Sequence, residues 1–246
     1  MTKIIVVASG KGGVGKSTIT SSLGRMLAKM GNRTLLIDMD AGLAGLDLML
    51  DVSGQAVFNW ADVVNEDCDI DKATIEVSDN LYLLPAPDSY INDITSEQFE
   101  LAFSDLDDSD YDFILLDAPA GLGHGLRRAS SIADRAIVVS TADNISSKAA
   151  KIVRDKLDEY GVPQTRLIIN RFRKKPTLQG NYLNIDNTID KAGVQLIGII
   201  PEDYGIQYVS MEGKFKDNKS STVTAFERIA RRLCGENVSL DLRKLK

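Results

Sequence analysis

Short apolar runs alternate with segments of helical periodicity along almost the whole chain. The apolar runs are rich in β-branched residues, which is typical of strands. They predict strands at residues 4–8, 34–37, 81–84, 113–116, 136–140, 167–169 and 196–200. Between them, apolar residues recur at spacings of three and four, which predicts helices near residues 17–30, 57–65, 95–105, 124–133, 144–160, 184–192 and 221–234.

Several of these strands are apolar at consecutive positions, as in a parallel sheet that is covered on both faces. Repeated strand–helix units predict an α/β fold with a doubly wound, mostly parallel sheet and helices on both faces. No internal repeat, low-complexity linker or break in composition divides the 246 residues. We therefore expect a single domain over residues 1–246, with residues from about 236 to 246 as a frayed tail.

The most informative segment is Gly-Lys-Gly-Gly-Val-Gly-Lys-Ser at residues 10–17, between the first strand and the first helix. It fits the phosphate-binding pattern Gly-x4-Gly-Lys-[Ser/Thr]. Backbone N–H groups of such a loop surround phosphate oxygens, and the helix N-terminus adds a partial positive charge. Lys16 is expected to reach the β- and γ-phosphates, and Ser17 to ligate Mg²⁺. The predicted nucleotide-binding residues here are Gly10, Lys11, Gly12, Gly13, Val14, Gly15, Lys16, Ser17 and Thr18.

Acidic residues follow two of the predicted strands, at the carboxyl ends of the strands, where the phosphate loop also opens. Asp38 and Asp40 follow the second strand, where a carboxylate can orient a water molecule, hold the hydration shell of a metal, or cap a turn. Asp117 follows the strand 113–116 and is expected to bind Mg²⁺ through water. Ser17, Asp38 and Asp117 are thus the predicted metal residues. The turn 118–121 is flexible enough to sense a γ-phosphate.

A second group of polar residues is expected to recognise a base. Asn170 ends a strand, and its amide has the donor and acceptor that match the N6/N7 edge of adenine. Pro201, Glu202 and Asp203 end the last predicted strand and are placed to form a wall on the other side of the base. The predicted ligands are therefore ATP and Mg²⁺.

Charge and cysteine content limit the classes of ligand and the cellular compartment that the sequence favours. The net charge of −6 opposes broad binding to nucleic acid, which needs a basic surface. Cys68 and Cys234 form no metal or disulfide pattern, which favours a reducing cytoplasm. No stretch approaches the roughly 18 apolar residues of a membrane span, and a strand by residue 4 leaves no room for a signal peptide. His124, the only histidine, is expected in an exposed loop.

The predicted helix 144–160 carries two kinds of surface. Its expected buried stripe is Ala149, Ile152, Val153 and Leu157. The other side is basic and is expected to be either a solvated face or a partner-binding surface; it consists of Lys148, Lys151, Arg154 and Lys156.

Taken together, these motifs resemble the MinD/ParA family of deviant Walker-A ATPases. The resemblance runs in order from residue 3 to about residue 240, and the extra lysine at position 11 is specific to the group. The segments at 40–47 and 117–121 resemble the MinD branch more than the ParA branch. The matching segments are 10–18, 38–40, 40–47, 117–121, 169–171 and 200–203.

The resemblance implies a role for each motif. Lys11 would cross to the phosphates of a partner subunit in an ATP-dependent homodimer, so that Lys11, Lys16 and Asp40 form the catalytic set. Asp40 would position or activate the attacking water, and Asp117 would hold Mg²⁺. The activity implied is slow ATP hydrolysis, stimulated by a protein regulator, in a dimerisation switch for division-site placement.

Membrane attachment in this family normally uses a C-terminal amphipathic helix. Here Leu240, Leu242 and Leu245 do not form a long apolar face, so a weak intrinsic anchor or none is expected. The expected location is the cytoplasm, with peripheral association at the inner face of the cell membrane as the alternative.

Other functions remain open at this point. A ParA-like ATPase that positions DNA or cargo is opposed by the acidic charge, and an iron–sulfur carrier needs paired cysteines that Cys68 and Cys234 do not supply. A flagellar-number regulator shares the same motifs. An ATP-binding scaffold with little turnover is an alternative of another class.

Overall fold

The computed structural model describes residues 1–42, 45–89, 93–108, 110–173, 182–203 and 220–240. Within them, one eight-stranded sheet has the order β3-β4-β2-β5-β1-β6-β7-β8. Only the edge pair β3 and β4 is antiparallel. The strands are β1 (Lys3–Ala8), β2 (Thr34–Asp38), β3 (Ile75–Ser78), β4 (Leu81–Leu84), β5 (Phe113–Asp117), β6 (Arg135–Thr141), β7 (Thr165–Phe172) and β8 (Leu196–Pro201).

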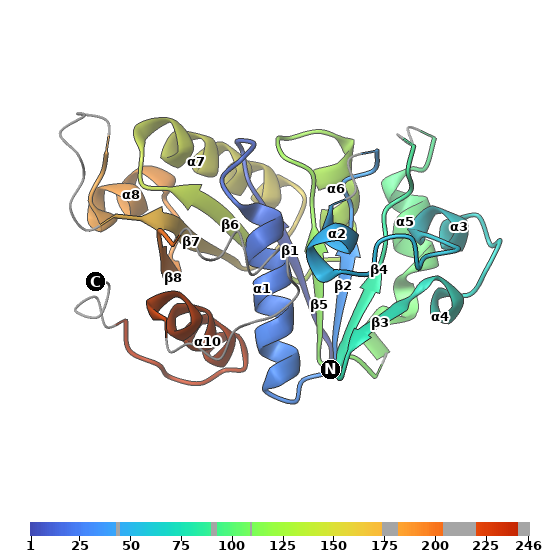
Figure 1. Ribbon diagram of the computed structural model, residues 1–246. Helices are drawn as coiled ribbons and strands as arrows, with labels where there is room; N and C mark the ends of the chain where they lie inside the picture. Colours follow the sequence, from blue (N-terminus) through green and yellow to red (C-terminus); the bar gives the residue numbers. More distant parts are fainter. Residues whose placement is uncertain (43–44, 90–92, 109, 174–181, 204–219, 241–246) are drawn as a thin grey trace.

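Helices cover both faces of this sheet (Figure 1). One face packs against α1 (Lys16–Lys29), α2 (Leu46–Leu50) and α10 (Ser221–Leu233). The other packs against α3 (Trp60–Val64), α4 (Ile70–Ala73), α5 (Ser96–Ala102), α6 (His124–Ser131), α7 (Asn144–Glu159) and α8 (Ile185–Ala192). The predicted fold class, an α/β doubly wound sheet that is mostly parallel, is confirmed.

The central strands are buried along their whole length, because helices exclude water from both sides. Their register decides where the chemistry lies. In the β1–β5 pair Val7 is opposite Asp117, and in the β2–β5 pair Asp38 is opposite Asp117. The carboxyl ends of β2 and β5, each with its aspartate, are therefore neighbours. They lie on the side of the sheet where β1 passes into the phosphate loop.

Several local predictions need correction. His124, expected in an exposed loop, is exposed but is the first residue of α6. The predicted helix near 95–105 is α5 followed by a separate 3₁₀ helix, η1 (Ser104–Asp108). Strand β3 and the short helices α2 and α4 were not predicted. In α7 the prediction of a buried Ile152 is wrong, since its side chain is 43% exposed. Val153 and Leu157 are buried as predicted, and Ala149 is half-buried. The rest of the buried face consists of Ser146, Ser147 and Ala150, so the stripe is rotated by part of a turn.

The C-terminal segment follows α10 across the protein surface. Residues 236–240 form neither helix nor strand, and Arg232 donates to the carbonyl oxygens of Val238 and Ser239 at 2.9 Å each. Leu242 and Leu245, on which the prediction of a weak anchor depends, lie outside the described residues. Among the residues that are described, no helix has both the length and the apolar composition needed to cross a membrane.

Candidate functional site

The glycine loop between β1 and α1 depends on backbone conformations that favour glycine. Gly13 and Gly15 have φ values of 75° and 91°, in the left-handed region that other residues adopt at a cost. Gly15 directly precedes α1, so its conformation directs the loop into the helix. The N–H groups of the first helical turn are consequently oriented toward the loop, as an anion site requires.

Close packing explains two of the glycines further. A Cβ atom at Gly10 would lie 2.6 Å from the carbonyl oxygen of Ala149 on α7. A Cβ atom at Gly15 would lie 2.4 Å from Nδ2 of Asn170. Asn170 was predicted to end its strand, but β7 continues to Phe172. The loop is therefore held between α7 and β7 at distances that only glycine permits.

Asn170 stabilises this loop directly. Its side chain is buried, and Nδ2 donates a 2.7 Å hydrogen bond to the carbonyl oxygen of Val14. An asparagine amide has a second N–H and an acceptor oxygen, so this bond does not use all its capacity. Sequence reasoning predicted the position of Asn170 near the nucleotide but not its contact with the loop. The predicted contact with adenine stays a prediction.

Lys16 and Asp117 form a buried ion pair at the floor of the loop. Lys16 Nζ lies 2.9 Å from Asp117 Oδ1, and the two side chains are 7% and 2% exposed. Thr20, one helical turn after Lys16, donates to the same carboxylate oxygen at 2.8 Å. Lys16 also donates to Ser17 Oγ at 3.4 Å. The residues predicted to bind phosphate and Mg²⁺ thus lie together, and Thr20 belongs to the same group. Thr20 was not predicted, although its position four residues after Lys16 places both on the same face of α1.

Asp38 organises the segment that follows β2. Its buried carboxylate accepts hydrogen bonds from the backbone N–H groups of Asp40, Gly45 and Leu46 at 3.0, 3.1 and 3.1 Å. Burial and the nearby charge of Asp117 raise the pKa of Asp38 to about 6, against the opposing effect of these hydrogen bonds. The capping role foreseen as one alternative is therefore present, and the metal role of Asp38 stays a prediction.

Asp40 is half-buried beside the same charges. Burial raises the pKa of its carboxyl, the charge of Lys16 opposes this, and the charge of Asp117 adds to it. A carboxylate with a raised pKa is a better proton acceptor than an ordinary aspartate. The segment from Asp38 to Asp40 is also held by Trp60 on α3, whose indole N–H donates to the carbonyl oxygen of Asp38 at 2.9 Å. The sequence did not predict this contact.

Lys11 differs from Lys16 in its surroundings. It is exposed, whereas Lys16 is buried against Asp117. The charge of Lys11 acts on the carboxyl of Asp143, the N-cap of α7. Burial raises the pKa of Asp143, but hydrogen bonds from Thr141 and Ser146 together with the charge of Lys11 bring that pKa below its ordinary value. One loop therefore presents one lysine inward and one outward.

The turn after Asp117 is bonded to the end of β1 and to the residue that leads into the phosphate loop. The N–H of Gly121 donates to the carbonyl oxygen of Ser9 at 2.9 Å, and the N–H of Ala118 donates to that of Val7 at 3.1 Å. The turn predicted to sense a γ-phosphate is therefore hydrogen-bonded to the residue that precedes the loop predicted to hold it.

Beside the loop, a cavity of about 290 Å³ brings together the residues predicted to bind adenine. It is lined by Gly15 and Thr18 from one side and by Asn170 and residues 201–203 from the other. Glu202 is held by an ion pair with Arg173, which lowers the pKa of Glu202. A concave site with a few converging polar groups suits a planar heteroaromatic ring.

A resident metal would depend on groups beyond the acidic side chains. In the described part of the chain, no group of three or more His, Cys, Asp or Glu side chains is arranged to hold a metal ion. A hydroxyl and one or two carboxylates suit Mg²⁺, which keeps several waters and takes further oxygens from phosphates. Ser17 and Asp117, both beside Lys16, fit that description.

Comparison with known proteins gives a consistent result. The family profile described as "CobQ/CobB/MinD/ParA nucleotide binding domain" matches residues 5–214. The septum site-determining protein MinD of Synechocystis sp. is 37% identical over 244 residues, which cover 97% of this chain and 91% of the relative.

Solved structures agree. The Aquifex aeolicus MinC:MinD cell division protein complex contains a chain with a TM-score of 0.89 and 33% identity, with 98% of each chain covered. The septum site-determining protein MinD of Pyrococcus horikoshii, complexed with Mg-ADP, has a TM-score of 0.83 and 29% identity, with 95% of this chain and 96% of that chain covered. These matches span almost the whole chain. The protein therefore belongs to the MinD family, within the CobQ/CobB/MinD/ParA group of nucleotide-binding domains.

Proposed function

We propose that this protein is a division-site placement ATPase that hydrolyses ATP to ADP and phosphate and acts as a nucleotide-dependent dimerisation switch. The observation that carries the proposal is the loop with its buried Lys16 paired to Asp117 and its exposed Lys11. The relatives named as septum site-determining proteins support the biological setting. Membership in a nucleotide-binding family supports the chemistry.

The phosphates of ATP would be bound by the backbone N–H groups of the loop and by Lys16, whose ammonium group is already at the floor of the site. Ser17 and Asp117 would hold Mg²⁺ through a hydroxyl oxygen and through water, with Asp38 beside them. Bound Mg²⁺ supplies charge neutralisation on the phosphate oxygens. Thr20 keeps the Asp117 carboxylate in place through its 2.8 Å hydrogen bond.

Asp40 would orient the water that attacks the γ-phosphate. The water oxygen bonds to the γ-phosphorus, the bond from that phosphorus to the bridging oxygen of ADP breaks, and a water proton passes to Asp40. The raised pKa of Asp40 strengthens it as the acceptor. Asp38 sets the position of this residue by accepting its backbone N–H.

Lys11 would act on the neighbouring subunit. Two nucleotides that face each other across a dimer carry strongly repelling charges, and an outward lysine from each protomer offsets them. Because the two Lys11 ammonium groups would bind only the phosphates of a bound triphosphate, dimerisation would require ATP. The base would lie in the cavity beside Asn170, with residues 201–203 as its other wall.

A protein partner is expected to control turnover. The Aquifex aeolicus relative has been solved in a complex with MinC, which supports a protein partner for this chain. By analogy, a regulator would stimulate hydrolysis here and return the dimer to monomers. We place the protein in the cytoplasm, with peripheral association at the inner face of the cell membrane as the alternative.

Phosphate release and nucleotide binding test these roles separately. Lys16→Ala should abolish ATP binding because it removes the principal cation from the phosphates. Asp40→Ala should bind ATP with wild-type affinity and release no phosphate, in a steady-state assay with Mg²⁺. Unchanged turnover in Asp40→Ala would remove that residue from the mechanism, and wild-type protein that binds ATP without measurable turnover would favour a scaffold.

A further inference from the structure

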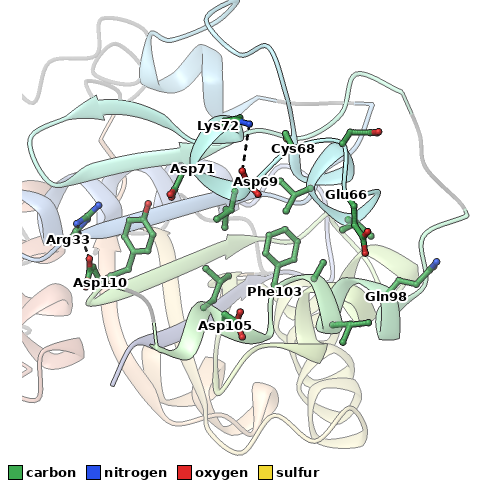
Figure 2. A pocket seen from close by; sticks show the side chains of 18 residues that line it. Arg33, Glu66, Cys68, Asp69, Asp71, Lys72, Gln98, Phe103, Asp105 and Asp110 are labelled. Atoms are coloured by element: carbon green, nitrogen blue, oxygen red, sulfur yellow. Dashed lines mark ion pairs between the residues drawn. The ribbon is translucent and has the colours of Figure 1, made fainter.

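A groove of about 870 Å³ lies at the amino-terminal end of the sheet, away from the phosphate loop (Figure 2). Arg33, which precedes β2, and Tyr111, which precedes β5, are at one end of it. Helices α3 and α4 form one side, and α5 and η1 form the other. A concavity of this volume is in the range of established binding sites.

The groove has an apolar floor. Phe103 and Leu106 line it and are 2% and 5% exposed, and Val63, Val64 and Ile70 contribute further apolar surface. Leu101 lines the same groove and is 78% exposed. One exposed leucine is ordinary on a protein surface. A leucine continuous with a concave apolar floor resembles the core of a protein interface.

The polar part of the groove is strongly acidic. Six carboxylates line it against two cations, Arg33 and Lys72. The cations are paired: Lys72 lies 3.7 Å from Asp69, and Arg33 lies 3.9 Å from Asp110. Arg33 also stacks against Tyr82 and Tyr111, with its guanidinium 5.1 Å from each ring centre.

Four carboxylates then remain without a compensating cation. No ion pair joins any of them to another residue in the described part of the chain. They are Glu66, Asp67, Asp71 and Asp105. Asp71 and Asp105 come from opposite sides of the groove, on α4 and η1, and both are exposed. Like charges on both sides of an apolar floor favour an occupant that is positively charged and amphipathic.

We propose that this groove binds a lysine- or arginine-rich amphipathic helix of a partner protein. Apolar side chains of that helix would pack on Phe103, Leu106 and Leu101, and its cations would meet Asp71 and Asp105. Nucleic acid and anionic lipid are disfavoured, because their phosphates would face four uncompensated carboxylates. The surface is separate from the nucleotide site, so its occupation does not require the proposed hydrolysis.

The test uses the full chain and a fluorescent synthetic helix of leucine and lysine, with leucines on one face and lysines on the other. Binding is followed by anisotropy at low and moderate salt. The double variant Asp71→Lys with Asp105→Lys should weaken binding by roughly tenfold or more, because two attractive charges become repulsive. Leu101→Asp should weaken it as well. Asp190→Lys, an exposed site on α8, is the matched control and should bind within about twofold of wild type.

Alkylation of the two cysteines shows where the synthetic helix binds. Cys68 lines the groove, and Cys234 lies beside α10 on the other side of the sheet; both are partly exposed. The helix should slow alkylation of Cys68 and leave Cys234 unchanged. Equal affinity of the double variant and the Asp190→Lys control, or equal protection of both thiols, would overturn the proposal.

A separate titration with spermine distinguishes a simple polycation site. Leu101→Asp adds a carboxylate and should strengthen binding of spermine, which has only positive charges to offer. If the carboxylates alone attracted the leucine–lysine helix, Leu101→Asp would strengthen binding of that helix too. That result would also overturn the proposal, which requires the apolar contact. Circular dichroism of each variant confirms that these exposed substitutions leave the fold intact.

Discussion

Asp38→Asn gives the sharpest test of the electrostatics beneath the phosphate loop. The carboxyl of Asp38 has a pKa of about 6 in the folded protein against an ordinary value of 3.8. Because its folded-state pKa is raised, ionisation is less favourable in the folded state than in the unfolded chain. The stability associated with Asp38 is therefore greatest below pH 3.8 and falls as the pH rises through the interval up to about 6.

The magnitude follows from the pKa difference. A rise of about 2 in pKa, at ~1.4 kcal/mol for each, gives a loss of about 3 kcal/mol at neutral pH. Asparagine keeps the shape of the side chain but carries no charge. The altered hydrogen bonds to the backbone N–H groups change stability by an amount that does not depend on pH, so they do not affect the slope.

The assay is urea unfolding of the nucleotide-free protein, followed by circular dichroism at intervals between about pH 4 and pH 7. The free energy of unfolding of Asp38→Asn, minus that of the wild type, should increase across this range by about 2 kcal/mol, because part of the effect already occurs below pH 4. Asp190→Asn, at an exposed carboxylate on α8, should show no such trend. A difference between Asp38→Asn and wild type that stays constant with pH would refute the reasoning.

Three further substitutions test two hydrogen bonds at the site and the packing of α10 on β8. Asn170→Ala removes the buried 2.7 Å bond to the phosphate loop and should cost about 1–3 kcal/mol in urea unfolding, with weaker ATP binding. Thr20→Val keeps the shape but loses the bond to Asp117, and should lower Mg²⁺ affinity by roughly tenfold or more in a nucleotide-binding titration. Gly198→Ala places a methyl group 2.3 Å from a carbon of Ile229 and should cost about 1–3 kcal/mol of stability. Wild-type values in these assays would contradict each contact.

The sequence was most informative where local chemistry determines structure. The glycine pattern at 10–17 predicted the loop because left-handed torsions and close backbone contacts both require glycine, as Gly15 illustrates. The β-branched runs predicted the buried strands because burial on both faces leaves few polar positions. Acidic residues at strand ends predicted that Asp38 and Asp117 would lie beside the phosphate loop, since parallel strands end on the same side of a sheet; their direct pairing was found only in the structure.

What could not be predicted depends on contacts between distant segments. The bond from Asn170 to Val14 joins residues 156 positions apart and leaves no local signature. The edge strand β3 alternates half-buried and exposed residues over only four positions, too short for a clear pattern. The error at Ile152 arose because the helix buries small serine and alanine residues against the sheet, while a large apolar residue remains outside.

The groove at α3–α5 was also absent from the sequence prediction. Its carboxylates are scattered between residues 66 and 110, and in the sequence they are indistinguishable from solvated acidic loops. Only the packing of α5 and η1 opposite α3 and α4 brings them around one apolar floor.

The central claim is that Lys11 acts on the nucleotide of a second copy. Light scattering of the wild type and of Lys11→Ala, each with a non-hydrolysable ATP analogue and Mg²⁺, tests it most directly, with ADP as the reference state. The account predicts a wild-type dimer with the analogue and a monomer with ADP, and a Lys11→Ala protein that binds the analogue normally but stays monomeric. A Lys11→Ala protein that dimerises as fully as the wild type would contradict it.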